Sequence, residues 1–307
     1  GGVTLGTVVG AIFLVLRDKF YGDGITSQEL ENSIPALPDS QNFKRLMIFA
    51  LPVVLGALAQ NMASLVDLAT VQRQLSTALN ADASALIASH GQALATVPLE
   101  DITSNLYGCY KGGAYSFYNL IPTVTSMIGV SALPSLATAW AQEDKKMIKY
   151  NIEAVLRIVS IIALPVGLGI SALSGEILTI FYPSSDQVSI MTNLLFVLAL
   201  SGVLVGVAMP VTSMLQAIGK QWVPVRNIAV GAAIKIIVNF ILVGIPQINI
   251  IGAPIGTLCC YIYIALSNMV CIIKYSKVKP KVFSVLAKPL VAAIVCGVAA
   301  YFTNFVL

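Results

Sequence analysis

Long apolar segments alternate with short polar ones along the whole chain. The clearest apolar segment covers residues 46–71 and contains no basic side chain. A helix of about 26 residues is roughly 39 Å long, which is enough to cross a hydrocarbon core about 30 Å thick. Segments of similar character occur at about 2–16, 46–71, 114–136, 152–173, 188–209, 223–245, 250–273 and 282–305. The pattern therefore predicts an all-α, polytopic transmembrane helix bundle of about eight spans.

The span predicted over 46–71 is polar in its second half. Gln60, Ser64 and Asp67 are three or four residues apart and share one helical face, and Asn61 lies beside them. An Asp near the centre of a span costs about 2.5–3.5 kcal/mol on insertion scales, so it normally faces a wet cavity or a partner. We expect this helix to line a pathway. Two roles remain open for Asp67, because it lies near the outer end of the span: a solvated helix end, and a cavity-wall or ion-coupling carboxylate.

Lys235 is the strongest single anomaly, because it falls in the middle of a predicted span. Gly231 and Asn239, each four residues away, lie on the same side of the helix and are expected to widen and wet it. Two interpretations stay open. Lys235 is either one half of a structural ion pair, for instance with Asp67 or Glu153, or a cationic contact for an anionic headgroup in a central cavity.

No catalytic constellation accompanies these residues. His90 is the only histidine, and the chain contains no GxSxG, HExxH, Walker A or dinucleotide-binding motif. The cysteines have no metal-ligand spacing, so we expect neither a metal nor another cofactor. We therefore predict a non-enzymatic protein with a substrate cavity. Its candidate residues are Lys235, Asn239, Gln60, Asn61 and Asp67.

Composition and charge placement agree with a membrane protein of fixed orientation. The chain is 57% hydrophobic and 10% charged, whereas soluble domains carry roughly 25% charged residues. Its net charge of +4 comes from basic residues in short loops between apolar runs, so it sets orientation and implies no nucleic-acid partner. With segment 17–45 in the cytoplasm, twelve basic residues fall inside and two, Arg73 and Lys111, fall outside.

The segment 72–112 then lies on the outer side and is too polar to insert. Its apolar residues have the spacing of an amphipathic surface helix: Leu75, Leu79, Leu86, Ile87 and Leu94. The first residues enter an apolar segment without an initiator Met, and the last residues are still apolar. We therefore expect the chain to be a portion of a longer protein.

Three stretches in order carry a family resemblance: LPVVLGALAQNMASLVDLATVQRQL at 51–75, LYGCYKGGAYSFYNLIPTVTSMIGVSALPSLATAWAQEDKK at 106–146, and IKIIVNFILVGIPQINIIGAPIGTLCCY at 234–261. They resemble the second half of bacterial polysaccharide-biosynthesis membrane proteins of the stage V sporulation protein B type. That group belongs to the multidrug/oligosaccharidyl-lipid/polysaccharide (MOP) exporter superfamily. The same superfamily contains the lipid II flippases and the multidrug and toxin extrusion (MATE) antiporters.

The resemblance implies a two-lobed, MATE-like transporter with a central cavity between the lobes. Residues 1–16 are then similar to the last helix of the first lobe, and 17–45 to the cytoplasmic linker between lobes. Residues 46–273 are similar to the second transmembrane lobe, with 72–112 as its extracellular loop. Residues 274–307 are similar to a cytoplasmic basic segment followed by one additional transmembrane helix.

The implied function is to flip a lipid-linked oligosaccharide or cell-wall precursor across the bacterial cytoplasmic membrane by alternating access. The implied partners are a polyprenyl-diphosphate sugar and membrane lipid, and a coupling cation stays open. One alternative is an ion-coupled multidrug antiporter for organic cations. Another is a non-transporting membrane scaffold for wall-synthesis enzymes. The central Lys235 favours an anionic substrate, and the resemblance supplies no motif that fixes the cavity residues.

Overall fold

The computed structural model of the chain describes residues 2–21, 38–94, 97–183 and 186–306. Within these ranges the regular elements are all helices, so the predicted all-α class is confirmed. The chain divides into two compact units, Gly1–Ile48 and Phe49–Leu307. The first unit contains α1 (Gly2–Tyr21) and the first residues of α3 (Asp39–Ala81).

Part of the linker predicted at 17–45 lies outside the described residues, namely 22–37. On either side of this gap the chain is helical, up to Tyr21 and again from Asp39. The helix that the sequence predicts over 46–71 is longer at both ends in the structure, because α3 runs from Asp39 to Ala81.

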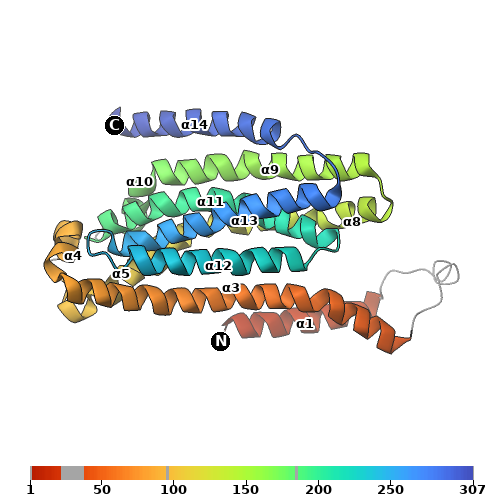
Figure 1. Ribbon diagram of the computed structural model, residues 1–307, viewed down its shortest axis with the longest axis horizontal. Coiled ribbons are helices and arrows are strands. Elements are labelled where there is room, and N and C mark those ends of the chain that lie inside the picture. The colour runs from red at the N-terminus through yellow and green to blue at the C-terminus, as the bar shows by residue number, and fades with distance from the viewer. Residues whose placement is uncertain (1, 22–37, 95–96, 184–185, 307) are drawn as a thin grey trace. The chain divides into compact units, whose positions relative to one another are not determined.

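The rest of α3 and fifteen further helical elements form the described part of the second unit (Figure 1). The elements from Ala83 to Phe181 are α4 (Ala83–His90), η1 (Gly91–Leu94), η2 (Leu99–Asp101), α5 (Ile102–Gly108), the π-helix η3 (Cys109–Ala114), α6 (Tyr115–Tyr118), α7 (Leu120–Ser131), α8 (Leu133–Ala141), α9 (Lys145–Ala172) and α10 (Ser174–Phe181). The elements from Val188 onwards are α11 (Val188–Ala217), α12 (Trp222–Leu242), η4 (Asn249–Ile251), α13 (Gly252–Ser276) and α14 (Val282–Val306).

Six helical stretches among the described residues are long and apolar enough to cross a membrane. They are Asp39–Leu58, Leu120–Ala141, Lys145–Ala172, Val188–Ala217, Trp222–Leu242 and Asn249–Ser276. The shorter apolar stretch Val8–Arg17 overlaps the first predicted span, and the stretch Ser284–Ala299 falls within the last one. The chain is therefore a multi-pass membrane protein.

The helix α11 is central to the second unit, because it packs against α7, α9 and α13. Two glycines bring its neighbours close. A Cβ added at Gly206 would lie 2.9 Å from Cβ of Ala163 on α9, and one added at Gly202 would lie 2.6 Å from Cδ1 of Ile121 on α7. Small residues at these positions allow membrane helices to pack closely where apolar burial alone cannot drive association.

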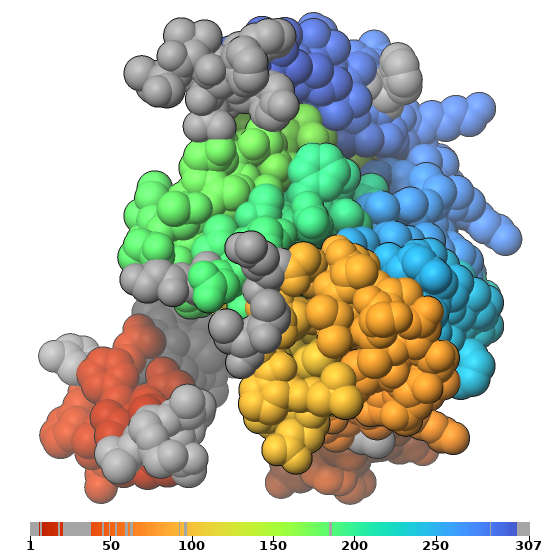
Figure 2. Space-filling view, turned by 90° about the vertical axis from the view of Figure 1, so that its left-hand side faces the viewer, coloured from red at the N-terminus to blue at the C-terminus, as the bar shows by residue number. Residues whose placement is uncertain are grey.

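The described residues of the segment 72–112 belong to the second unit, and Figure 2 shows their orange and yellow atoms beside the light-blue atoms of α12 and α13. The expected surface helix is wrong in one respect, because its apolar face does not lie open. Leu75, Leu86 and Leu94 are fully or almost fully buried in one hydrophobic cluster, and Leu79 and Ile87 pack against it. The apolar face of this segment is therefore buried against other helices of the protein instead of in lipid.

A hydrogen-bond network ties this segment to η4. His90 Nε2 lies 2.7 Å from Oδ1 of Asn249, and Asn249 Nδ2 donates to Ser89 Oγ at 3.0 Å and to the Pro246 carbonyl at 2.9 Å. Asn249 is fully buried and has a φ of 37°, which an Asn tolerates better than most residues. Burial lowers the pKa of His90 below its ordinary value, and the contact with Asn249 opposes this shift.

Candidate functional site

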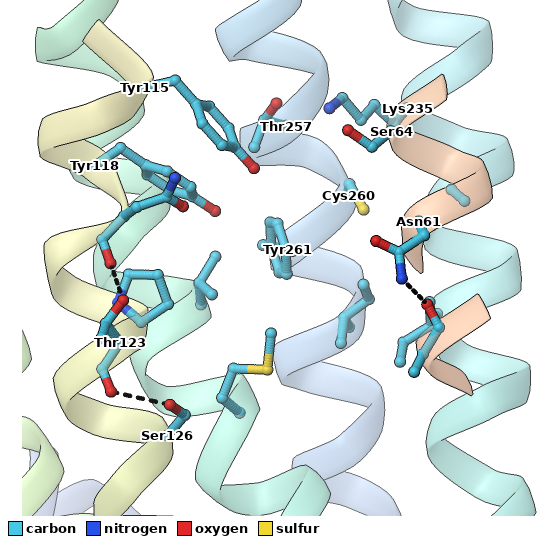
Figure 3. Close-up of a pocket in the computed structure, with 18 of the residues that line it drawn as sticks. Asn61, Ser64, Tyr115, Tyr118, Thr123, Ser126, Lys235, Thr257, Cys260 and Tyr261 are labelled. Atoms are coloured by element: carbon cyan, nitrogen blue, oxygen red, sulfur yellow. Dashed lines mark hydrogen bonds between the residues drawn. The ribbon is translucent and has the colours of Figure 1, made fainter. Parts of the chain in front are cut away.

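A cavity of about 540 Å³ opens within the second unit, between the helices α3, α6, α7, α11, α12 and α13 (Figure 3). Its polar wall includes Asn61, Ser64, Lys111, Asn119, Thr123 and Lys235. Met209 and Ile228 lie on its apolar side. Such a mixture of an apolar body with a few polar groups is typical of a small-molecule site.

Lys235 reaches this cavity from α12 and forms an ion pair behind its wall. Its Nζ lies 3.0 Å from Oδ2 of Asp67 on α3, and the Asp67 side chain is 1% exposed. The other carboxylate oxygen, Oδ1, accepts a hydrogen bond from Asn239 Nδ2 at 2.7 Å. A buried carboxylate is stable only when it is paired and hydrogen-bonded, and Asp67 has both kinds of partner.

Lys111 adds a second positive charge to the same carboxylate. Its Nζ lies 3.5 Å from Asp67 Oδ2, and it is 4.0 Å from the ring centroid of Tyr115 and 5.4 Å from that of Tyr110. These distances fit cation–π contacts. Lys111 belongs to the π-helix η3, an irregularity that is frequent at functional sites. We call Asp67, Lys235, Lys111 and Asn239 the charged cluster.

The charged cluster carries an excess of one positive charge in its ordinary ionisation states, since two lysines face one carboxylate. Both lysines also line the cavity, with side chains that are 17% and 21% exposed for Lys235 and Lys111. The cavity wall therefore favours an anionic group over a cationic one.

The predicted site residues do not all reach the cavity. Lys235 and Asn61 line it, whereas Asp67 and Asn239 lie behind Lys235 as its supporting partners. Asn61 Nδ2 donates to the carbonyl of Ala57 at 2.9 Å. The side chain of Gln60 lies outside the described residues.

The structure also separates the two partners considered for Lys235. It pairs with Asp67, whereas Glu153 lies 3.9 Å from Lys149 and accepts a hydrogen bond from the backbone N–H of Lys281. Because Lys235 is both paired and on the cavity wall, the two interpretations are compatible.

The expectation that Gly231 widens and wets its side of α12 is wrong. Gly231 is buried, and a Cβ added there would lie 2.7 Å from Cγ1 of Ile264 and 3.1 Å from Sγ of Cys260 on α13. The glycine instead allows α12 and α13 to pack closely.

Sequence reasoning missed Lys111 and the aromatic side chains Tyr115, Tyr118 and Tyr261 of the cavity wall. Lys111 lies in a polar stretch, so the sequence predicts it in the outer segment 72–112. One signal was available: Lys111, Tyr115 and Tyr118 are spaced four and three residues apart, which puts them on one face if the segment is helical.

A second polar system lies at the opposite part of α12 and is uncharged at its centre. Asn227 Nδ2 donates to Asn268 Oδ1 at 2.8 Å, and Asn268 Nδ2 donates to Thr212 Oγ1 at 2.9 Å. Both amides are 0% exposed, and Arg226 Nη2 lies 3.4 Å from Asn227 Oδ1. We call Asn227, Asn268 and Thr212 the amide network. Thr212 borders a smaller cavity of about 210 Å³.

The two cavities adjoin each other. Four residues line both of them, one from each of α3, α7, α11 and α12: Ala57, Ser126, Met209 and Ile228. Within the described part of the chain, no group of three or more His, Cys, Asp or Glu side chains could hold a metal ion.

Comparison with known proteins places the chain in a family. Residues 118–307 match the family described as Lipid II flippase MurJ. The chain is also 22% identical, over 320 aligned residues, to the Lipid II flippase MurJ of Bacillus subtilis (strain 168). That alignment covers 100% of this chain and 54% of the relative, so the chain spans about half the relative's length. No solved structure matches. Since the family match covers more than half of the chain, the chain belongs to the MurJ lipid II flippase family.

Proposed function

We propose that this chain forms one wall of a transporter that flips a lipid-linked cell-wall precursor across the cytoplasmic membrane. The observation that carries the proposal is a cavity wall with two lysines, backed by one buried carboxylate, in a member of the lipid II flippase family. The remainder of a full-length protein would supply the other wall, because the chain spans about half of its relative.

The physical requirement for such a substrate is simple. A sugar diphosphate headgroup cannot cross hydrocarbon without losing its hydration, whereas its polyprenyl tail is stable there. A polar cavity beside lipid solves both problems, because the headgroup moves through it while the tail stays in the membrane. Lys235 and Lys111 would meet the diphosphate, and the neutral groups Asn61, Ser64 and Asn119 would meet hydroxyls of the sugar.

The finer assignment concerns the substrate group and the ion. We propose that the chain resembles flippases of the stage V sporulation protein B type within this superfamily, and that its substrate is a lipid-linked oligosaccharide or, as in the relative's name, lipid II. At Asp67 no free coupling cation is needed, because the ammonium of Lys235 already occupies the position 3.0 Å from its carboxylate. Transport that does not depend on sodium or potassium at constant membrane potential would agree with this.

The alternative functions fit the site less well. An antiporter for organic cations would need an accessible carboxylate, but Asp67 is buried behind two lysines. A scaffold without transport would need no polar cavity, whereas this unit holds one of about 540 Å³.

We also propose the division into lobes implied by the family architecture. Residues 1–16 end the first lobe, 17–45 form the cytoplasmic linker, 46–273 form the second lobe with an outer segment 72–112, and 274–307 add one helix. The variants Ser84→Cys and Lys145→Cys, each carrying the introduced thiol as the single cysteine of the protein, test this orientation in intact cells. A membrane-impermeant thiol reagent should label the first and not the second, and the reverse pattern would invert the proposed orientation.

The function itself is tested with the full-length protein in proteoliposomes. Leaflet exchange of a fluorescent polyprenyl-diphosphate sugar is compared with uptake of an organic cation, for wild type, Lys235→Ala and Lys149→Ala. Lys149 is the matched control, because it is a half-exposed lysine paired to Glu153 and does not line the cavity. Sugar-lipid exchange that fails only in Lys235→Ala supports the flippase. Cation uptake alone would favour the antiporter, and neither activity would favour the scaffold.

A further inference from the structure

Gly256 on α13 lies directly against the side-chain amide of Asn239 on α12. A Cβ added at residue 256 would fall on Oδ1 of Asn239, and would lie 3.1 Å from its Cγ and 3.3 Å from the carbonyl oxygen of Lys235. Asn239 is 1% exposed, so its amide cannot move aside into solvent. Any side chain at residue 256 would therefore displace the amide or push α12 and α13 apart.

The amide that Gly256 accommodates sets the rotation of a carboxylate. Asn239 Nδ2 donates to Oδ1 of Asp67 at 2.7 Å, which leaves Oδ2 facing Lys235 at 3.0 Å and Lys111 at 3.5 Å. Asn239 Oδ1 has no hydrogen-bond partner among the described residues, so contact with Gly256 limits its position instead. Moving the amide would remove the group that holds Oδ1, and the carboxylate would be free to turn.

We propose that Gly256 is a positioning residue for the cavity cations. By leaving room for Asn239, it keeps Asp67 at the rotation that places the ammonium of Lys235 on the cavity wall. The chain of contacts is Gly256 to Asn239, Asn239 to Asp67, and Asp67 to Lys235. That this placement serves headgroup binding rests on the proposed flippase function, whereas the placement itself does not.

A second glycine between the same two helices provides the matched control. A Cβ at Gly231 would meet Cγ1 and Cδ1 of Ile264 at 2.7 and 2.8 Å, so Gly231→Ala also crowds the contact between α12 and α13. The atoms that it meets belong to apolar side chains of α13 rather than to Asn239. A general packing defect should therefore follow from either substitution, and a displaced Lys235 only from Gly256→Ala.

The test measures Lys235 directly and needs no substrate. Full-length protein is purified as wild type, Gly256→Ala, Asn239→Ala, the double variant and Gly231→Ala. Lysine amines are methylated with formaldehyde and a borane reductant, and mass spectrometry compares the rate at Lys235 with that at Lys149. Gly256→Ala and Asn239→Ala should each raise the Lys235 rate several-fold, Gly231→Ala should leave it unchanged, and the double variant should match Asn239→Ala.

Several results would overturn the inference. They are a wild-type rate in Gly256→Ala, an equal rise in Gly231→Ala, and a double variant that exceeds Asn239→Ala. If Gly256→Ala does not fold, the double variant decides, because removing the displaced amide should restore the yield to that of Asn239→Ala. Failure to restore it would contradict the chain of contacts.

Transport is then measured in proteoliposomes. Gly256→Ala should raise the sugar-lipid concentration for half-maximal exchange several-fold, with a smaller change in maximal rate. A wild-type half-maximal concentration in Gly256→Ala would contradict a role in headgroup binding. If the wild type moves no sugar lipid, the flippase proposal fails, and the methylation rates still decide whether Gly256 positions Lys235.

Discussion

The charged cluster and the amide network are two buried polar systems that share the helix α12, and they differ in what holds them together. In the charged cluster, one carboxylate is shared by two lysines and an amide, and the lysines reach a cavity. In the amide network, Asn227, Asn268 and Thr212 join α12, α13 and α11 through neutral hydrogen bonds. A neutral hydrogen bond contributes about 1 kcal/mol to folding stability, whereas the stability cost of a buried charge depends strongly on whether its partner is present. The first system is suited to recognition and the second to holding helices together.

Removing the shared carboxylate should cause the largest combined loss of stability and transport. Asp67→Ala leaves Lys235 and Lys111 close together without their counter-charge, and breaking a buried pair in this way costs about 3–5 kcal/mol. We expect a large fall in the thermal unfolding midpoint in detergent and a loss of sugar-lipid exchange. A midpoint within error of wild type would mean that the cluster is hydrated rather than buried.

Removing one lysine should separate transport from stability. Lys235→Met keeps the apolar stem, and Asp67 retains Lys111 and Asn239 as partners. We expect a smaller loss of stability than in Asp67→Ala, together with a loss of sugar-lipid exchange of at least about tenfold, which corresponds to roughly 1.4 kcal/mol. Normal exchange in this variant would remove Lys235 from the substrate path.

The amide network should show the opposite pattern. Asn268→Leu leaves the amide of Asn227 without its buried acceptor, which costs about 1–3 kcal/mol. We expect a lower unfolding midpoint with exchange close to that of wild type per folded molecule. The double variant Asn227→Leu/Asn268→Leu removes both partners and should recover part of the loss. If Asn268→Leu lowered sugar-lipid exchange more than Lys235→Met does, the amide network could not be assigned to stability alone.

The smallest effect is expected at His90, where acid converts a neutral network into a charged one. Burial lowers its pKa, so the unfolded chain binds the proton more readily and folding stability falls as the pH drops below about 6.5. We expect the unfolding midpoint of wild type to decrease more between pH 7 and pH 5 than that of His90→Gln. Equal slopes for the two proteins would show that the contact with Asn249 does not titrate in this range.

The sequence predicted the charged cluster better than the amide network. A lysine within an apolar run is costly wherever it lies, so Lys235 was conspicuous, and Asp67 could be named as its partner. Asn227 and Asn268 gave no such signal, because an amide in an apolar segment costs less and is satisfied by whichever helix lies opposite. Lys111 was lost for another reason: it sits in a polar stretch, and only the fold brings it back to Asp67.

The helices themselves were predictable from hydropathy, and their packing was not. The lengths of the apolar segments located the helices that are long enough to cross the membrane, including α9, α11 and α13. The segment 72–112 was harder, because an apolar helical face can be buried in lipid or in protein and its pattern is the same in both cases. The role of Gly231 was misread likewise, since a glycine can leave space or allow contact, and only the opposing Ile264 decides between them.

Gly231 lies midway along α12 between Asn227 and Lys235, at the point where α12 and α13 are in tight contact. A rigid rod that tilts about such a fulcrum moves its two halves in opposite directions. A tilt of α12 about this contact would therefore change the charged cluster and the amide network together, because they lie on the two sides of Gly231 along the same helix.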